Sequence, residues 1–95
     1  MADDLKRLKD VRAAYKGHCT RSMTKAEGIM SSTNPDRDEL QNLLEAVSLR
    51  REKISLEDQR IENSVEPTDI ESEIQGALEY NDKLTAFENK VRRFL

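Results

Sequence analysis

The fold is decided by the stretch SSTNPDRDE (residues 31–39), which ends one long helical pattern and begins another. Asn34 is placed to cap a helix whose first position is Pro35, where a missing N–H costs nothing. The acidic residues that follow favour the positive end of the helix dipole. We therefore expect a chain reversal at this stretch, with a long helix on either side.

A second break lies at VEPTDIE (65–71). Pro67 disfavours helical geometry at Glu66. Thr68 and Glu71 form a T-x-x-E capping box that predicts the start of a further helix.

The two breaks predict three helices, at about 4–31, 35–65 and 68–95. Each is roughly 40–45 Å long at about 1.5 Å per residue. Helices of matched length joined by short connections favour an antiparallel up-down-up bundle. An open hairpin that swaps helices with a second chain in a dimer is the alternative.

Composition supports an all-α, coiled-coil protein. Charged residues make up 37% of the 95 residues, and the chain holds only three glycines, two prolines and four aromatic residues. Such a composition is typical of long helices. We expect residues 1–95 to form a single helical domain. The apolar pattern continues into the final KVRRFL, so we also expect the chain to be a fragment or module of a longer protein.

Apolar residues recur every seven positions on the second and third predicted helices, and less regularly on the first. A 3.5-residue repeat is typical of left-handed supercoils. The predicted core positions are Leu5, Leu8, Val11, Tyr15, Cys19, Met23, Ala26, Ile29, Met30, Leu40, Leu43, Leu44, Val47, Ile54, Ile61, Val65, Ile70, Ile74, Ala77, Leu78, Leu84, Val91 and Leu95.

Three polar residues interrupt these apolar faces: Arg51 and Asp58 on the second helix, and Asn81 on the third. A buried polar group costs stability but penalises misaligned helix pairing, so we interpret the three as register residues. A charged internal site is the alternative.

Two further sets of apolar residues lie outside the main stripes: one points away from the predicted core, and one flanks the stripe of the third helix. Leu49 and Leu56 lie seven apart on the outer side of the second helix, and Tyr80, Phe87 and Phe94 form a similar column on the third. A column of exposed apolar residues indicates a contact surface. The alternative is that a three-helix core needs wide apolar faces, which suits the aromatic column better than the leucines.

The stretch RAAYKGHCTR (12–21) holds the only histidine and the only cysteine. Cys19 falls on the inward stripe and is expected to behave as a small core hydrophobe. His18 lies at the edge of that stripe, where we expect a contact with another helix. Arg12 flanks the apolar face, so its stem can pack while its charge meets an acidic neighbour.

The opposite side of the same helix is poor in large side chains. Ala14, Gly17 and Arg21 share this outer line, and Gly28 continues it. A helical glycine costs about 1 kcal/mol relative to alanine. Close approach of another chain is one explanation for Gly17, and a simple helix kink is the other.

The sequence offers no catalytic or metal-binding constellation. A catalytic site needs a nucleophile, a base and a group that orients the base. His18 and Cys19 are adjacent, so on a helix they point about 100° apart. Zinc needs about four ligands. We expect no enzyme, no cofactor and no small-molecule substrate.

The N-terminus MADDLKRLKD is not a signal peptide, and no apolar run approaches the roughly 20 residues that span a bilayer. One cysteine cannot form an internal disulfide. We expect a soluble, intracellular, cytoplasmic protein that does not bind membranes.

Charge is distributed unevenly along the chain. Residues 1–31 carry seven basic and four acidic residues, whereas the remainder carries nine basic and fifteen acidic residues. Complementary charges between packed helices are one interpretation. A basic face for weak, salt-sensitive nucleic-acid binding is the other, with Arg7, Arg21 and Lys25 as candidate phosphate contacts.

The run LKRLKDVRAAYKGHCTR resembles the opening of Gag-type polyproteins of Bel/Pao-class LTR retrotransposons and their host-derived relatives. Those proteins open with a basic helix containing an Arg, then Lys-Gly or a similar pair, then Thr-Arg. The later EIQGALEYNDKLTAFENKV resembles the helical segment that follows. This resemblance implies an assembly module of a structural polyprotein. The matching residues are Arg12, Lys16, Gly17, Thr20 and Arg21.

Together these features predict a structural interaction module that mediates self-association or assembly with another protein. The alternatives are a nucleic-acid-binding module that uses the basic first helix, and a spectrin-like spacer or adaptor domain. The candidate interface residues are Leu49, Leu56, Ala14, Gly17, Arg21, Phe87 and Phe94.

Overall fold

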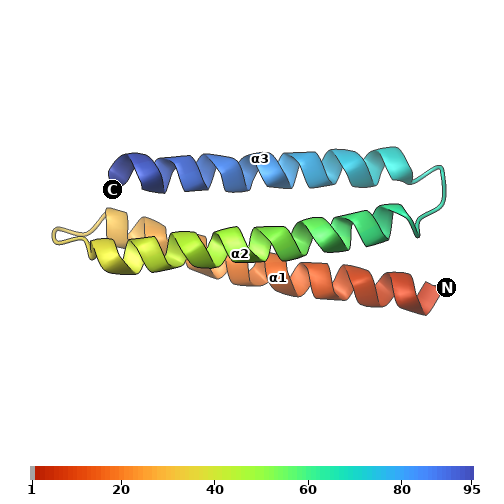
Figure 1. Cartoon of the computed structure of the whole chain (residues 1–95), viewed down its shortest axis with the longest axis horizontal. Helices are drawn as coiled ribbons and strands as arrows, with labels where there is room; N and C mark the ends of the chain where they lie inside the picture. Colours follow the sequence, from red (N-terminus) through yellow and green to blue (C-terminus); the bar gives the residue numbers. More distant parts are fainter. Residues whose placement is uncertain (1) are drawn as a thin grey trace.

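The computed structural model describes residues 2–95, with side chains from Asp4 onward, and it confirms the predicted helical bundle. The helices are α1 (Ala2–Met30), α2 (Arg37–Glu62) and α3 (Ile70–Phe94). Successive helices run in opposite directions along an elongated body of 50 × 21 × 16 Å (Figure 1). α2 packs more extensively on α1 than on α3.

The first connection differs from the prediction in its cap. α2 is capped by Asp36, whose extended backbone lets Oδ1 accept a hydrogen bond from the N–H of Glu39 at 3.0 Å. The predicted cap at Asn34 is wrong, because Pro35 belongs to the connection rather than to the first turn of the helix. An aspartate at this position also interacts favourably with the helix dipole.

The second connection is longer than predicted. α2 ends at Glu62, because the N–H groups of Ser64 and Val65 both bond back to the carbonyl of Ile61. α3 begins after Asp69, which makes no side-chain cap. The predicted capping box at Thr68 therefore does not form.

The apolar core is concentrated at one end of the bundle, where α1 ends, α2 begins and α3 ends. We call this the closed end. Burying a side chain the size of Leu or Phe contributes about 1.5–3 kcal/mol. The main core cluster comprises Cys19, Met23, Ala26, Leu40, Leu44, Val47, Ile54, Leu84, Phe87 and Val91.

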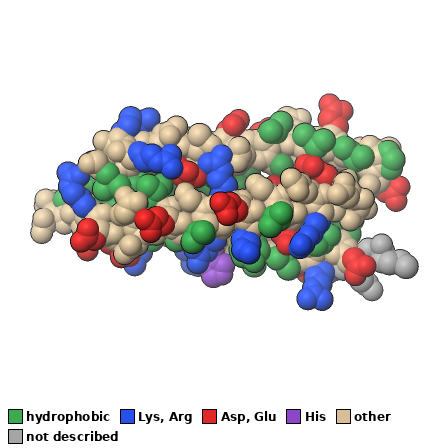
Figure 2. Space-filling view, in the orientation of Figure 1, with side chains coloured by type: hydrophobic (Ala, Val, Ile, Leu, Met, Phe, Trp, Pro, Cys, Tyr) green, Lys and Arg blue, Asp and Glu red, His purple; other side chains and the backbone are tan. Residues whose placement is uncertain are grey.

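The opposite end, where α1 begins, α2 ends and α3 begins, is packed more loosely, and we call it the open end. Ile61 is fully buried there, but Ile74 and Leu78 are 41% and 60% exposed. Figure 2 shows hydrophobic side chains on the surface over the first half of α3. The prediction that Ile74 and Leu78 belong to the core is wrong, because no helix covers their side of α3.

The cap can be tested with a pair of substitutions in one connection. Asp36→Ala should lower the free energy of unfolding by about 1 kcal/mol, because the N–H of Glu39 loses its acceptor. Asn34→Ala should change it by less than about 0.5 kcal/mol. Urea denaturation followed by circular dichroism measures both, and equal losses would contradict the assignment of the cap.

Candidate interaction surface

Arg12 of α1 connects all three helices. Its Nη1 donates to Asp58 Oδ1 of α2 at 3.0 Å and to Glu73 Oε2 of α3 at 2.9 Å. Lys9 Nζ lies 3.6 Å from Glu73 Oε1. The side chains of Arg12, Asp58 and Glu73 are all less than one-fifth exposed. This Arg12 cluster thus fixes the mutual positions of the helices at the open end.

The contacts of the Arg12 cluster shift the pKa values of Glu73 and Arg12. The hydrogen bond from Arg12 lowers the pKa of the Glu73 carboxyl, which burial opposes, and the positive charges of Arg12 and Lys9 lower it further. Burial alone would lower the pKa of Arg12, but hydrogen bonds and charges from Glu73 and Asp58 outweigh it and raise that pKa. The ionised states of Glu73 and Arg12 are therefore favoured in the folded protein.

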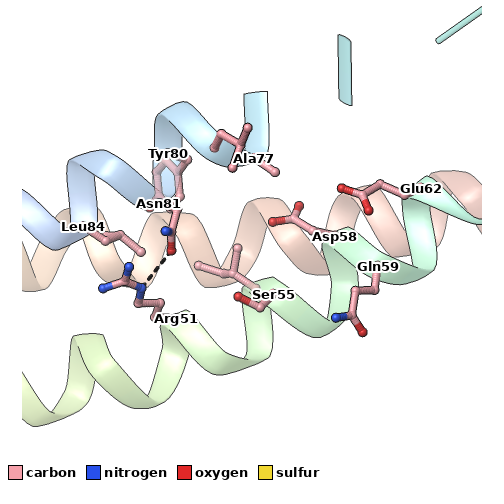
Figure 3. Close-up of a pocket in the computed structure, with 11 residues that line it drawn as sticks. Arg51, Ser55, Asp58, Gln59, Glu62, Ala77, Tyr80, Asn81 and Leu84 are labelled. Carbon is pink, nitrogen blue, oxygen red and sulfur yellow. Dashed lines mark hydrogen bonds between the residues drawn. The ribbon is translucent and has the colours of Figure 1, made fainter. Parts of the chain in front are cut away.

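Arg51 of α2 forms a second polar contact, this one with α3 alone. Its Nε donates to Asn81 Oδ1 at 2.9 Å, Nη1 to Glu88 Oε1 at 2.8 Å and Nη2 to Thr85 Oγ1 at 2.6 Å. Figure 3 shows the bond to Asn81. Glu88 is only 6% exposed and also accepts from Arg92 at 3.3 Å. We call these contacts the Arg51 clamp.

These contacts bear on the three predicted register residues. Arg51 and Asn81 meet directly, whereas Asp58 pairs with Arg12 instead. Among the side chains that the structure describes, no buried nitrogen or oxygen lacks a hydrogen-bond partner. Sliding one helix would break these bonds, and an orphaned buried group costs about 1–3 kcal/mol. The geometry therefore favours the register interpretation over a charged internal site.

The seam between α1 and α3 is also polar. The Tyr80 hydroxyl donates to the Lys16 carbonyl at 3.4 Å, and Lys16 Nζ lies 4.4 Å from the centroid of the Tyr80 ring. Burial raises the pKa of Tyr80 to about 12 and also raises the pKa of the fully buried Cys19 thiol. Cys19 thus packs as the predicted core residue.

The candidate phosphate contacts on α1 do not converge on one site. Lys25 pairs with Glu39 of α2 at 2.9 Å, and Arg21 bonds His18 Nδ1 at 2.9 Å. Arg7 is exposed more than three helical turns from both. The predicted contact of His18 with another helix is wrong, because His18 is exposed and bonds to its own helix.

The exposed large hydrophobic residues lie on α2 and α3. Within the described side chains, α1 contributes none. The five and their exposed fractions are Leu49 at 65%, Leu56 at 49%, Ile74 at 41%, Leu78 at 60% and Leu95 at 39%. The surface that carries the first four is called the α2–α3 face below.

A shallow groove runs between the two helices of this face. One hollow of about 310 Å³ lies toward the open end, where Leu78 of α3 stands across from Ser55 and Gln59 of α2. Figure 3 shows Arg51 at one end of this hollow and Glu62 at the other. A second hollow of about 420 Å³ is lined by Leu49 and by Arg92 of α3. Leu49 and Leu78 therefore border two separate hollows along this groove, which share no lining residue.

The aromatic column of α3 is part of the core rather than of an interface. Phe87 is 6% exposed and belongs to the core cluster, so its assignment as an interface residue is wrong. Phe94 is half-buried against that core, and the Arg37 guanidinium lies 5.7 Å from its ring centroid. A third helix that covers two others needs a wide apolar face, which was the alternative explanation.

The small-residue line on α1 makes no contact with another helix that requires its small side chains, as far as the described residues show. Ala14 and Arg21 are exposed. A methyl group added to Gly17 would meet only Arg21 Nη1, at 3.5 Å, and one added to Gly28 would meet nothing within 4 Å. Neither glycine has a positive φ. No contact inside the described molecule therefore requires a glycine at either position.

The described residues contain no group of three or more His, Cys, Asp or Glu side chains placed to hold a metal ion. No helix in residues 2–95 is long and apolar enough to cross a membrane. The chain matches no protein family, no curated protein and no solved structure at a significant level. Functional inference therefore rests on the geometry of the surface.

The Arg12 cluster predicts a specific pH dependence. Because the pKa of Glu73 is lowered in the folded state, its stabilisation is present above the unfolded value of about 4.3 and is lost as pH falls through the folded value. Glu73→Gln should lower the free energy of unfolding by about 1–3 kcal/mol at pH 7. The difference in the free energy of unfolding between Glu73→Gln and the wild type should be smaller at pH 3 than at pH 7.

The matched control is Asp10→Asn, which removes an exposed pair with Lys6 on α1. It should cost less than about 0.5 kcal/mol at pH 7. Urea denaturation at both pH values tests the pair of variants. A loss for Glu73→Gln that is the same at pH 3 and pH 7 would contradict the ionic role of the cluster.

The small-residue line can be tested by adding methyl groups. Gly17→Ala and Gly28→Ala should each raise the free energy of unfolding by about 0.5–1 kcal/mol, because alanine favours the helix and both sites have room. Thermal denaturation measures this gain. A loss of stability or association for Gly17→Ala alone would show instead that another chain packs against this line.

Proposed function

We propose that this chain is a structural interaction module that self-associates through its α2–α3 face. The observation that carries the proposal is the position of the exposed apolar side chains. Leu49 and Leu78 border two separate hollows between α2 and α3, and Leu56 and Ile74 are also exposed on these two helices. Monomeric proteins rarely leave a large contiguous apolar patch in water.

The size of the surface also supports the proposal. A long side of the body measures 50 × 21 Å, or about 1,000 Å² in projection. A stable, specific interface buries about 800 Å² on each partner. The α2–α3 face is therefore large enough for a dimer contact without any rearrangement of the bundle.

The alternatives have less support. Nucleic-acid binding needs cations that are free to neutralise phosphates, but Lys9, Arg12 and Lys25 are engaged with carboxylates of α2 and α3. A spacer or adaptor role does not explain the exposed leucines. The Gag-like assembly role is a special case of the proposal, and its support is the motif in α1.

Charge substitution in the face tests the proposal. Leu49→Glu combined with Leu56→Glu should weaken the wild-type dimer at least about tenfold, which corresponds to about 1.4 kcal/mol, because two carboxylates would be desolvated in the contact. Sedimentation velocity over a range of concentrations measures the dissociation constant.

The control is Ala13→Glu combined with Thr20→Glu, which places two carboxylates seven residues apart on the exposed side of α1. This variant should associate as the wild type does, and circular dichroism should show equal helicity in all three proteins. A wild-type chain that stays monomeric up to about 1 mM would overturn the proposal, because at that concentration a contact of about −4.1 kcal/mol or stronger is detected.

A further inference from the structure

The charges of α3 are divided between its two halves. Residues 70–82 carry four acidic and no basic residues, whereas residues 83–95 carry four basic residues and one acidic residue. The helix dipole favours such a distribution only within the first and last turns. Glu79, Asp82 and Lys83 lie in the middle of the helix, so the dipole does not explain them.

Part of this charge is not neutralised inside the molecule. Glu73, Glu88 and Lys90 pair with residues of α1 or α2. The remaining charged residues of α3 are exposed, and apart from Arg92, which bonds to Glu88, none makes an ion pair with a described side chain. They are the acidic Glu71, Glu79 and Asp82, and the basic Lys83, Arg92 and Arg93. Of these, Lys83 lines a hollow against α1 and therefore lies away from the α2–α3 face.

We propose that the partner on the α2–α3 face is a second copy of this chain, docked so that the two α3 helices run antiparallel about a two-fold axis. The inference rests on the proposed function and adds the identity and direction of the partner. In this arrangement the acidic half of each α3 faces the basic half of the other, twice by symmetry. A parallel arrangement would oppose like charges.

The Arg51 clamp makes this arrangement geometrically simple. Arg51 contacts Asn81 and Thr85, so the middle of α2 lies beside the middle of α3. One axis perpendicular to the helices therefore passes close to both midpoints. Leu49, at the middle of α2, and Leu78, about 6 Å along α3 from its middle, both lie close to that axis.

The same axis defines which residues of the two α3 helices meet. Residue 82 is the midpoint of α3, so Gln75 of one chain lies level with Asn89 of the other. Both side chains are exposed and uncharged. Two copies of Gln75 would instead be about 21 Å apart along the helix direction, because they are separated by 14 residues of rise.

Cross-linking with variants that each add one exposed cysteine to the buried Cys19 tests the direction. Gln75→Cys and Asn89→Cys chains are mixed in equal amounts and treated with a bismaleimide cross-linker that spans about 10 Å. This length is about half the 21 Å that separates the two copies of residue 75 in the antiparallel dimer, so the cross-linker cannot join them. We expect the mixed cross-link between the two variants to predominate over either self-cross-link. Wild-type chain, whose Cys19 is fully buried, is the control and should not cross-link.

Sedimentation of the same samples distinguishes failure of the antiparallel arrangement from failure of dimerisation itself. One outcome would overturn the antiparallel arrangement alone. In it, the sample is a dimer, the Leu49→Glu and Leu56→Glu substitutions dissociate that dimer, and the self-cross-links predominate. A dimer with no cross-link between these positions would do the same. A monomeric sample would overturn both this inference and the proposed function.

A charge exchange provides a second readout. In the antiparallel dimer, Glu71 of one chain lies level with Arg93 of the other. Glu71→Lys alone and Arg93→Glu alone should each weaken dimerisation, because each substitution places two residues of the same charge opposite one another. An equimolar mixture of the two variants should restore it, since each new charge then faces its opposite. Unchanged dimerisation of both single variants would contradict the role of the charges.

Discussion

The guanidinium of Arg12 is the contact on which the arrangement of the three helices depends. Among the described side chains it alone donates hydrogen bonds to both of the other helices, through Asp58 and Glu73. Arg12, Asp58 and Glu73 are largely buried, so their ion pairs must offset a cost of desolvation, which requires good geometry. The two short bonds of Arg12 provide that geometry where apolar packing is thin.

These hydrogen bonds of Arg12 explain why the α2–α3 face of the bundle stays uncovered. At the closed end, α3 is held by the burial of Leu84, Phe87 and Val91. At the open end it is held largely by Glu73 and by the contact of Tyr80 with Lys16. The apolar residues of its first half are therefore not needed to attach α3 to α1 and α2. They remain available for a contact with another molecule.

Much of the fold could be predicted from the sequence, because it depends on periodicity. The seven-residue repeat of α2 gives Leu40, Val47, Ile54 and Ile61, which are all buried. The flank position of Arg12 likewise predicted that its charge would meet acidic neighbours. Such features follow from the angle of a side chain around its helix, which the sequence determines directly.

Other features depend on how far the helices cover one another, which periodicity does not report. Ile74 and Leu78 share the predicted stripe of α3, yet no neighbour covers them. Phe87 lies to one side of that stripe but is buried, because α3 packs against both α1 and α2. The burial of Glu88 was not predicted, although the sequence contains a signal for it. Glu88 lies four residues after Leu84 and therefore on the apolar stripe of α3, just as Arg51 lies on the apolar stripe of α2.

The caps could not be predicted for a different reason. Whether Asn34 or Asp36 caps α2 depends on the path of the connection, and both are suitable residue types. The exposure of Leu49 and Leu56 was predicted correctly, but the placement of Leu49 beside a groove was not. That placement required the position of α3 relative to α2.

The central claim is that the α2–α3 face is the surface on which this chain meets a second copy. Two-dimensional ¹⁵N–¹H NMR spectra recorded over a dilution series test it most directly, because backbone amide shifts report the contacted surface residue by residue. The account predicts concentration-dependent shifts around Leu49, Leu56 and Leu78, and none around Ala14 and Gly17. Shifts confined to the outer side of α1, or spectra that do not change on dilution, would contradict it.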